Sequence, residues 1–353
     1  MGTIRRVAVV GTADPIGMPG SVARGFEALG LAVTLVPSAD WAPRLGVALR
    51  GAGLVNRGLA EVTAPLIAAR ALARLQRFRP DLVVMMKCDD LPLGFEAAAR
   101  RLTGARVVAF HPDDPWNVGH GLRSGPAHRR AVGHLRGADL AFLWSRPLVA
   151  RAESEGLRAR WLPFACDPGL HPPGGEARPE LGSEVVFIGN WDEERERMLG
   201  PLAESGVELA VWGTHYWRDR CRHPALQAAW RGRPLLAAEQ GAALRASALS
   251  VNILRLQNKG ATNMRTFEVP CMGGFALHEA SDEAAHFFPP GLAAAYFKDP
   301  TDLVAQARGW LAAAAEARAA IAAEGQRRAL AWTYKAWAEA VLAAVSGGLG
   351  HFT

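Results

Sequence analysis

The chain has 353 residues, a length that predicts two domains of about 150 to 200 residues rather than a single core. Its 50% of hydrophobic and 21% of charged residues are usual for a soluble globular enzyme, and no stretch approaches the ~20 apolar residues of a membrane span. The formal net charge is +6, but the basic residues are spread out and nearly all Arg, so no long basic run indicates a nucleic-acid-binding protein.

In the first half of the chain, short apolar runs alternate with helical patterns. The expected strands are Val7–Val10, Ala32–Val36, Leu82–Met86, Val107–Phe110 and Leu140–Trp144, and the expected helices are Ser21–Leu29, Ala60–Phe78, Phe95–Leu102 and Leu148–Glu155. Strands that alternate with helices imply βαβ units and a mostly parallel sheet. We therefore predict an α/β, Rossmann-like domain over residues 1–166.

A cluster of Pro and Gly at residues 167–183 breaks this pattern and is predicted to be a linker. The alternation then restarts with the expected strands Glu184–Ile188, Glu208–Trp212, Val251–Leu254 and Phe275–Leu277 and the expected helices Glu193–Glu204, Leu235–Ser247 and Thr262–Met272. A second Rossmann-like domain is predicted over residues 184–325. Two Ala-rich helices follow, Thr301–Glu324 and Gln326–Val345, and residues 326–353 are predicted to form a final helix and tail.

The four cysteines, at positions 88, 166, 221 and 271, have spacings that fit neither a disulfide scaffold nor a zinc site. A short apolar run after the N-terminal Met-Gly-Thr-Ile-Arg-Arg is typical of a first strand, not of a signal peptide. Both features predict a cytoplasmic protein. Any membrane contact would be peripheral, at the inner face of the membrane.

Residues 250–279 are the most informative segment for function. An apolar strand runs into a polar loop, and a helix that starts near Thr262 carries Asn263, Arg265 and Glu268. The start of such a helix presents free backbone N–H groups and the positive end of the helix dipole, which suit a phosphate. Arg265 adds a forked cation, and Glu268 can accept two hydrogen bonds from a ribose diol. Together they predict a site for a nucleotide diphosphate.

A second group of polar residues directly follows the strand Val107–Phe110. His111, Asp113 and Asp114 are candidates for a general base, because ligands of open α/β sheets bind beyond the carboxyl ends of the strands. The alternative is an Asp-Pro turn in which these side chains cap the backbone. Two carboxylates in one loop are weak support for a metal site, and we expect none.

The chain resembles a known family at Asn263-Met-Arg-Thr-Phe-Glu268, Gly273-Gly274-Phe and the preceding strand Ser250-Val-Asn-Ile. Weaker similarity covers Pro112-Asp-Asp-Pro115, Leu162-Pro-Phe-Ala-Cys-Asp167 and Val186-Phe-Ile-Gly-Asn190. These segments are similar to GT-B glycosyltransferases of the CgeB-like, spore-maturation group, which have a C-terminal glycosyl transferases group 1 domain. The resemblance implies two Rossmann-like domains that face each other across a cleft, with the last helix packing back towards the first domain.

The resemblance also implies roles for individual residues. Glu268 matches the acidic residue that holds the donor ribose, and Asn263 and Arg265 would face the diphosphate. Gly189 and Asn190, followed by Arg195 and Arg197, could supply backbone N–H groups and a cation from the other side. Many relatives have a Glu-x7-Glu pair, and here Gly260 occupies the position of the earlier Glu.

We therefore expect a glycosyltransferase that moves a sugar from a nucleotide-diphosphate sugar to a hydroxyl of a polysaccharide, glycolipid or protein. It would need no cofactor and no metal, because the helix start and Arg265 stabilise the leaving diphosphate. Two alternatives are a nucleotide-sugar epimerase on the same scaffold and a non-catalytic nucleotide-sugar-binding or envelope-assembly protein. Gly260 in place of Glu favours the second of these.

Overall fold

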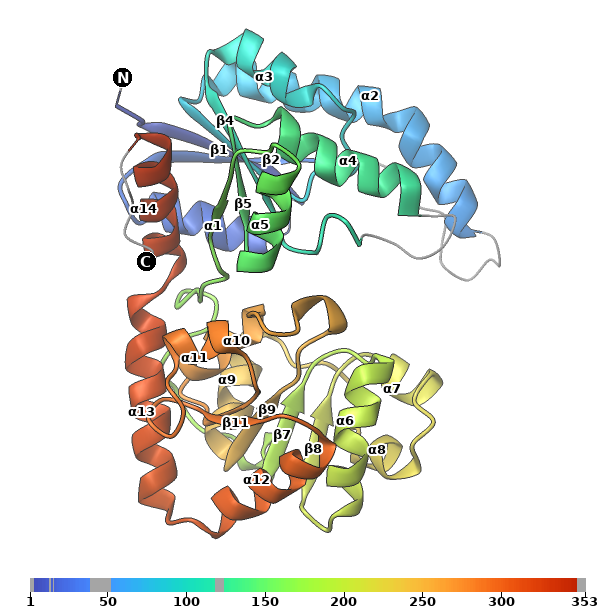
Figure 1. The fold of residues 1–353 in the computed structure, drawn as a ribbon, viewed down its shortest axis with the longest axis vertical. Helices are drawn as coiled ribbons and strands as arrows, with labels where there is room; N and C mark the ends of the chain where they lie inside the picture. Colours follow the sequence, from blue (N-terminus) through green and yellow to red (C-terminus); the bar gives the residue numbers. More distant parts are fainter. Residues whose placement is uncertain (1–2, 13, 15, 39–51, 118–123, 348–353) are drawn as a thin grey trace. The chain divides into compact units, whose positions relative to one another are not determined.

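The computed structural model describes residues 3–347 apart from 13, 15, 39–51 and 118–123. It divides into two compact α/β units (Figure 1). The first comprises Met1–Pro163 with Tyr334–Thr353, and the second comprises Phe164–Thr333. No helix in the described part of the chain is both long enough and apolar enough to cross a membrane.

The first unit is built on a parallel sheet in the order β2-β1-β3-β4-β5-β6. Its strands are β1 (Arg6–Gly11), β2 (Ala32–Pro37), β3 (Leu82–Met86), β4 (Arg106–His111), β5 (Leu140–Leu143) and β6 (Ala159–Trp161). Its helices are α1 (Met18–Glu27), α2 (Ala52–Phe78), α3 (Phe95–Thr103), α4 (Ser124–Gly137), α5 (Arg146–Ser154) and α14 (Tyr334–Val345). β3 is buried along its whole length, as expected for a strand covered on both faces.

The second unit has a parallel sheet in the order β11-β10-β9-β7-β8. Its strands are β7 (Val185–Ile188), β8 (Leu209–Trp212), β9 (Leu249–Asn252), β10 (Ala276–Glu279) and β11 (Ala295–Phe297). Its α-helices are α6 (Glu193–Glu204), α7 (Tyr216–Asp219), α8 (Pro224–Ala229), α9 (Ala237–Ala246), α10 (Met264–Cys271), α11 (Asp282–Phe287), α12 (Pro300–Ala312) and α13 (Ala315–Ala331), with short 3₁₀ helices η2 (Pro179–Leu181) and η3 (Leu256–Asn258).

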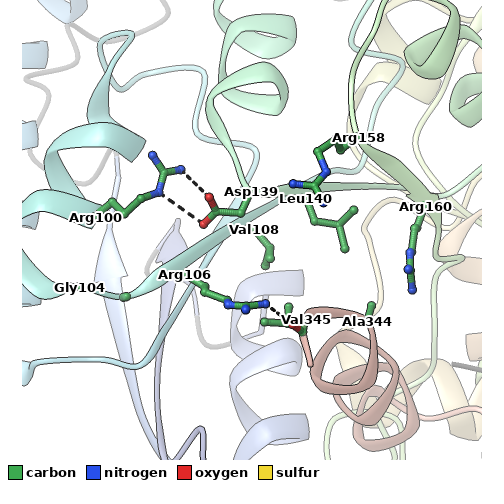
Figure 2. A pocket seen from close by; sticks show the side chains of 11 residues that line it. Arg100, Gly104, Arg106, Val108, Asp139, Leu140, Arg158, Arg160, Ala344 and Val345 are labelled. Carbon is green, nitrogen blue, oxygen red and sulfur yellow. Dashed lines mark hydrogen bonds and ion pairs between the residues drawn. The ribbon is translucent and has the colours of Figure 1, made fainter. Parts of the chain in front are cut away.

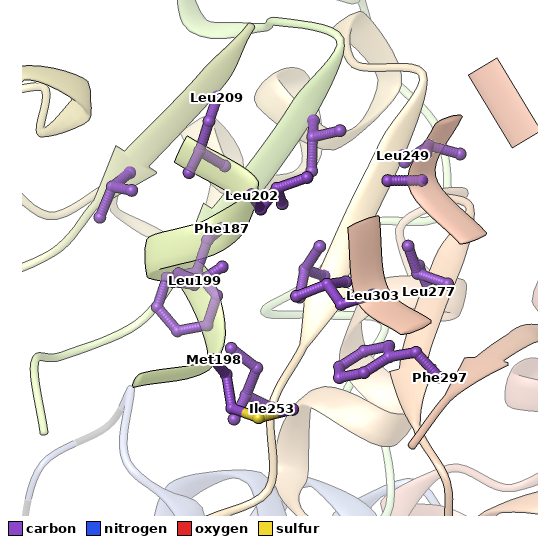
Figure 3. Packing of buried hydrophobic residues seen from close by; sticks show 14 of the residues in the cluster. Phe187, Met198, Leu199, Leu202, Leu209, Leu249, Ile253, Leu277, Phe297 and Leu303 are labelled. Carbon is purple, nitrogen blue, oxygen red and sulfur yellow. The ribbon is translucent and has the colours of Figure 1, made fainter. Parts of the chain in front are cut away.

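The core of the second unit lies between this sheet and helices α6 and α12. Figure 3 shows Phe187 of β7 beside Met198 and Leu199 of α6, with Leu303 of α12 near Phe297. Because the apolar faces of these helices repeat every three to four residues, they cover the strands continuously. This core holds the carboxyl ends of β7 and β9 in fixed positions.

The C-terminal helices differ from the prediction. The chain forms α12, α13 and α14 rather than two helices over Thr301–Glu324 and Gln326–Val345. The break after α13 has a physical cause: the Trp332 indole donates to the Phe164 carbonyl (2.7 Å), and the Trp332 carbonyl accepts from the Cys166 backbone N–H (3.3 Å). These bonds pull the chain out of helical geometry, so the helix that returns to the first unit begins at Tyr334 rather than near 326.

Residues 167–183 belong to the second unit rather than forming a separate linker. His171 is buried, the Arg178 backbone N–H donates to the Ala242 carbonyl (3.3 Å), and the Gln326 side chain donates to the Pro173 carbonyl (2.7 Å). The prolines and glycines thus shape a segment that packs against α9 and α13. The first unit accordingly ends at residue 163 instead of 166.

Most expected strands lie within one or two residues of their predicted bounds, and β9 is Leu249–Asn252 rather than Val251–Leu254. The sequence patterns did not predict β6, β11, α4, α7, α8 or α11. β6 and β11 have three residues each, too few for a periodic pattern. α4 contains Gly and Pro within Ser124–Gly137, which weaken any helix prediction.

Candidate functional site

The candidate site of the second unit lies at a change of strand order. The chain runs from β7 to β8 on one side and then crosses to β9 on the other side of β7. Such a reversal opens a crevice at the carboxyl ends of the two strands, where open α/β sheets bind their ligands. Gly189 and Asn190 follow β7, and the loop that leads to α10 follows β9. The predicted donor-binding residues therefore come together at this edge, with the later Glu268 inside α10.

Asn263 caps the N-terminus of α10. Its side-chain oxygen accepts from the Thr266 backbone N–H (2.9 Å), and the Thr266 hydroxyl accepts from the Asn263 backbone N–H (3.0 Å). Asn263 and Asn252, the last residue of β9, also exchange two side-chain amide bonds (3.0 and 2.9 Å). These bonds use the polar groups of the Asn263 side chain to fix the helix start against the sheet, which gives this residue a structural role in the site.

A buried histidine supports the same helix start. His278 of β10 donates from Nδ1 to the Glu279 carbonyl (2.5 Å), and its Nε2 accepts from the Thr266 hydroxyl (2.8 Å). Burial lowers the pKa of His278 to about 4, so the ring is neutral at physiological pH. The backbone N–H groups of Met264 and Arg265, which precede the capped Thr266, have no acceptor within the helix.

Three arginines gather around this helix start: Arg195 of α6, Arg255 after β9, and Arg265 of α10. Arg195 is largely buried, and burial lowers its pKa to about 10, with the positive charges of Arg255 and Arg265 acting in the same direction and Asp192 opposing them. Arg195 donates to the Asn190 carbonyl (2.6 Å) and lies 3.4 Å from the Asp192 carboxylate. Arg255 shares that carboxylate at 3.4 Å. Arg195 and Arg255 share the Asp192 carboxylate, and Arg265 pairs with Glu268, so the three cations outnumber the two carboxylates and favour an anion.

The predicted cation and the predicted carboxylate contact each other. Arg265 donates to Glu268 (2.5 Å) and to the Gln240 side chain (2.7 Å). Glu268 is only 4% exposed, and its other oxygen lies 4.0 Å from His171. In this structure the Glu268 carboxylate is thus covered by Arg265, whose side chain remains 28% exposed. A ribose could reach Glu268 only if Arg265 turned towards its ligand.

The turn after β7 offers fewer donors than the prediction assumed. The Gly189 backbone N–H donates to the Trp212 carbonyl (2.9 Å), and the Gly189 carbonyl accepts from the Trp217 indole (2.9 Å). Both groups of Gly189 are therefore occupied within the sheet and its covering helix. The Asn190 carbonyl is occupied by Arg195. Arg195, rather than the Gly189 backbone, presents positive charge from this side.

Arg197 differs from Arg195 although both lie on α6. It forms a two-bond pair with Glu194 (2.9 and 2.8 Å) on the surface, so it does not join the cationic cluster. The hydrogen bonds from Arg197, helped by a contact with Lys259, lower the pKa of Glu194 to about 2. Lys259 further pairs with Glu279, whose second oxygen accepts from the Leu254 backbone N–H (2.8 Å). This network ties the loop after β9 to α6 and β10.

The cavity between these elements is small. Phe187, Arg195, Gln240, Asn252 and Arg265 are among the residues that line a space of about 10 Å³, roughly one water molecule. A diphosphate would therefore bind over the arginines at the surface of this cavity, not inside it. Gly260, in the neighbouring loop, has φ = 77° and an open position beside its Cα, so backbone conformation rather than crowding favours Gly there.

The first unit places His111, Asp113 and Asp114 at the carboxyl end of β4. His111 is buried and pairs through Nε2 with Asp89 (3.1 Å), while its Nδ1 lies 2.8 Å from the Asp113 carbonyl. Asp113 forms an ion pair with Lys87 and keeps 29% of its side chain exposed. Asp114 accepts from the Trp116 backbone N–H (2.9 Å), the side-chain capping expected of a turn.

Sequence reasoning missed Asp89, Lys87 and Arg255. Lys87 and Asp89 follow β3, and their partners, Asp113 and His111, lie at the carboxyl end of β4, its neighbour in the sheet. The signal was present, because polar residues directly after a buried strand lie at the edge where ligands bind. Among the three predicted base residues, Asp113 and Asp114 are both half-buried, with Lys87 beside Asp113, and His111 is held between Asp89 and the backbone.

The class of fold is that of known glycosyltransferases. The chain has the GT-B fold, with two Rossmann-like units on parallel sheets, and residues 194–343 match the family described as "Glycosyl transferase-like". That match covers less than half of the chain and supports a glycosyl transferase-like domain in its second half. No curated protein sequence matches the chain significantly.

Individual solved structures resemble the whole chain at low sequence identity. Sucrose-phosphate synthase from Thermosynechococcus elongatus has a TM-score of 0.71 and 13% identity, with 97% of this chain and 98% of that one covered. Anabaena HepE in complex with UDP and glucose has a TM-score of 0.63 and 13% identity over 98% and 100% of the chains. A UDP-forming α,α-trehalose-phosphate synthase from Burkholderia xenovorans has a TM-score of 0.62 and 14% identity over 98% and 99%.

Proposed function

We propose that the protein transfers a sugar from a nucleotide-diphosphate sugar to a hydroxyl acceptor. The observation that carries this proposal is the convergence of Arg195, Arg255 and Arg265 on the free end of α10, at the strand-order reversal of the second unit. The glycosyl transferase-like match covers this region. The structures of HepE with UDP and glucose, or with UDP-glucose, are similar in fold and make UDP a reasonable first nucleotide to test.

The chemistry follows from the charges. When the bond between the sugar and the diphosphate breaks, negative charge grows on the leaving oxygen, and cations already in place stabilise it without rearrangement. Arg265 and the first N–H groups of α10 are suited to this role. We propose that these groups suffice, so that transfer needs no added metal. Glu268 would accept hydrogen bonds from the ribose once Arg265 turns to the diphosphate.

The acceptor side is proposed to use a carboxylate of the first unit. An inverting transfer needs a base that removes the proton of the attacking hydroxyl. Asp113 keeps 29% of its side chain exposed and pairs with Lys87, whereas the Asp114 side chain caps the Trp116 backbone N–H, so Asp113 is the better candidate. His111 and Asp89 would then position the Asp113 backbone, because the His111 ring contacts the Asp113 carbonyl and N–H.

Asp113→Asn is expected to lower kcat by at least about tenfold, which corresponds to ~1.4 kcal/mol, while nucleotide binding is unchanged. The amide keeps the shape of the side chain and cannot accept a proton. Asp114→Asn is the matched comparison, since Asp114 caps the backbone N–H of Trp116 and should mainly affect thermal stability. Initial rates at saturating donor measure the effect. If Asp113→Asn does not lower turnover tenfold, or if Asp114→Asn lowers it as much, Asp113 is not the base.

The proposed function itself is tested with a panel of nucleotide sugars, with and without hydroxyl acceptors. Release of nucleotide that increases with an acceptor, together with a new glycoside, supports transfer. An isomerised sugar formed without acceptor would instead show an epimerase. Thermal stabilisation without any turnover would show a binding protein. The assay is repeated with EDTA, and loss of turnover on chelation would contradict the metal-free part of the proposal.

The finer assignment is also a proposal. Residues 250–279 support placement in the CgeB-like group, and with it an acceptor in a cell-surface polysaccharide, glycolipid or protein. The four cysteines are buried thiols in the structure, which agrees with a reducing, cytoplasmic setting. Glycan, lipid and protein acceptors in the same panel distinguish the acceptor classes.

A further inference from the structure

The first unit contains another cationic group, far from its candidate base residues. Figure 2 shows Arg100, Arg106, Arg158 and Arg160 around a cavity of about 420 Å³. Arg106 is the first residue of β4, whereas His111 is the last. At about 3.3 Å per residue, these ends of the strand are roughly 17 Å apart. The cavity therefore lies at the amino-terminal edge of the sheet, opposite the edge where the fold places its substrates.

The pairing of the strands explains why these arginines converge. Side chains alternate along a strand, and residues paired between neighbouring strands point to the same face. Val108 pairs with Leu140, and Phe142 pairs with Arg160. It follows that Arg106 on β4, and Arg158 and Arg160 at β6, project from one face of three adjacent strands. The sheet thus forms the floor of the cavity.

Helix α14 forms a wall on the same face. Phe110 lies four residues after Arg106 on β4 and therefore on the same face of the sheet. Its ring packs edge-on against Trp337 of α14 (5.6 Å between ring centroids). The end of that helix contributes Ala344 and Val345 to the lining. Arg106 donates to the Val345 carbonyl, where the helix presents unsatisfied carbonyl groups. The C-terminal helix therefore fixes both the shape of the cavity and the position of one of its cations.

The positive charges outnumber the negative ones. Four arginines and a single Asp139 occur among the lining residues, a net charge of +3. Asp139 is already paired with Arg100 (3.1 Å), which also donates to the Gly137 carbonyl (2.9 Å). Among the residues that the structure describes, the Arg158 side chain contacts no carboxylate. Like charges held together raise the free energy of the folded chain unless an anion joins them.

We propose that this cavity binds a ligand that carries two or more phosphate groups. The guanidinium fork matches phosphate oxygens in pairs, and the cavity has the size of a small-molecule site. The ligand is either a soluble polyphosphate compound or the headgroup of an anionic lipid, which share this chemistry. An alternative explanation is that arginines on the edge strand β6 prevent this strand from pairing with another molecule. That explanation accounts for Arg158 and Arg160, but not for Arg100 and Arg106, which line the same cavity from other elements.

The first test uses inorganic tripolyphosphate as the probe and titration calorimetry as the measurement. The full chain carries Arg265→Ala, so that the candidate nucleotide site contributes little. Adding Arg158→Glu and Arg160→Glu is expected to weaken binding at least about tenfold and to reduce its dependence on salt. Arg74→Glu, at an exposed position of α2 outside the cavity, is the matched control and should bind as before. Circular dichroism verifies folding, and Arg158→Ala alone replaces the double variant if that one does not fold.

The second test distinguishes the two sources of phosphate. Vesicles of phosphatidylcholine, with or without cardiolipin, whose headgroup carries two phosphates, are mixed with the same variants and separated by flotation. Binding to tripolyphosphate that depends on Arg158 and Arg160 supports a soluble ligand. Flotation with cardiolipin that depends on these arginines supports a lipid headgroup. If the charge-reversed chain and the Arg74→Glu control behave alike with both probes, the cavity is no phosphate site.

Discussion

Arg265→Ala is expected to weaken the binding of UDP by about tenfold to a hundredfold. Hydrogen bonds to a charged group contribute about 1.5–3 kcal/mol, and each 1.4 kcal/mol is a factor of ten in affinity. Of the two ion-pair partners of Glu268, Arg265 has the more exposed side chain, 28% against 9% for His171, so it is the one that a ligand in solvent can reach. Titration calorimetry with UDP measures the effect. Arg265→Lys keeps the charge but loses the planar fork, so part of the loss should remain.

The matched control is Arg197→Ala, since Arg197 lies on α6 beside the site but is paired with Glu194 at the surface. Its UDP affinity should stay within a factor of about two, because exposed pairs of this kind contribute little. If Arg265→Ala binds UDP as tightly as Arg197→Ala does, the helix start does not hold the diphosphate.

Glu268→Gln separates two roles of the buried carboxylate. If Glu268 binds the ribose, as we propose, the substitution weakens UDP binding but leaves pyrophosphate binding unchanged. If Glu268 acts only by holding Arg265, the binding of UDP and of pyrophosphate should change equally. In that case the substitution acts only through Arg265, which loses its charged partner at 2.5 Å. Comparing the two titrations on one variant thus tests the ribose contact. Unchanged pyrophosphate binding also shows that the variant is folded.

Trp337→Ala is expected to destabilise the first unit by about 3–5 kcal/mol, the cost of removing a fully buried large side chain. Trp337 is 0% exposed and packs against Phe110. Its indole N–H has no hydrogen-bond partner in the described part of the chain, so the loss comes from packing alone. Thermal and denaturant unfolding, followed by near-UV circular dichroism, measure the change.

Two comparisons define this prediction. Trp337→Phe keeps an aromatic ring and removes the unsatisfied N–H, so it should cost much less than Ala. Trp116→Ala, at a half-buried position of the same unit, should also have a smaller effect. An unfolding midpoint for Trp337→Ala equal to that of the unchanged chain would mean that α14 is not part of the first unit's core.

Much of the architecture followed from local patterns in the sequence. Buried parallel strands read as continuous apolar runs, so nearly all of the longer strands were predicted. Trp332 shows the limit of this approach. Its helix looks continuous in sequence, but hydrogen bonds to Phe164 and Cys166, more than 160 residues away, end it. Contacts over such separations override local helix preference, and no local pattern contains them.

The candidate site shows the same limit at the level of side chains. The start of α10 and Arg265 were predictable, because a polar loop after an apolar strand marks a helix start at a sheet edge. Arg195 and Arg197 are two residues apart and point to opposite sides of α6, and the sequence alone did not reveal which one is buried. The contact of His111 with Asp89 depends on the order of β3 and β4 in the sheet, which local patterns do not determine.

The break at Trp332 and Thr333 also has a consequence for biosynthesis. The first unit is made from two separate stretches of chain, and Trp337, which packs against Phe110, belongs to the later one. A ribosome that has released residues 1–163 has therefore not yet supplied all the parts of that unit. Its core can close only after the second unit has been synthesised, so the part of the molecule translated first is completed last.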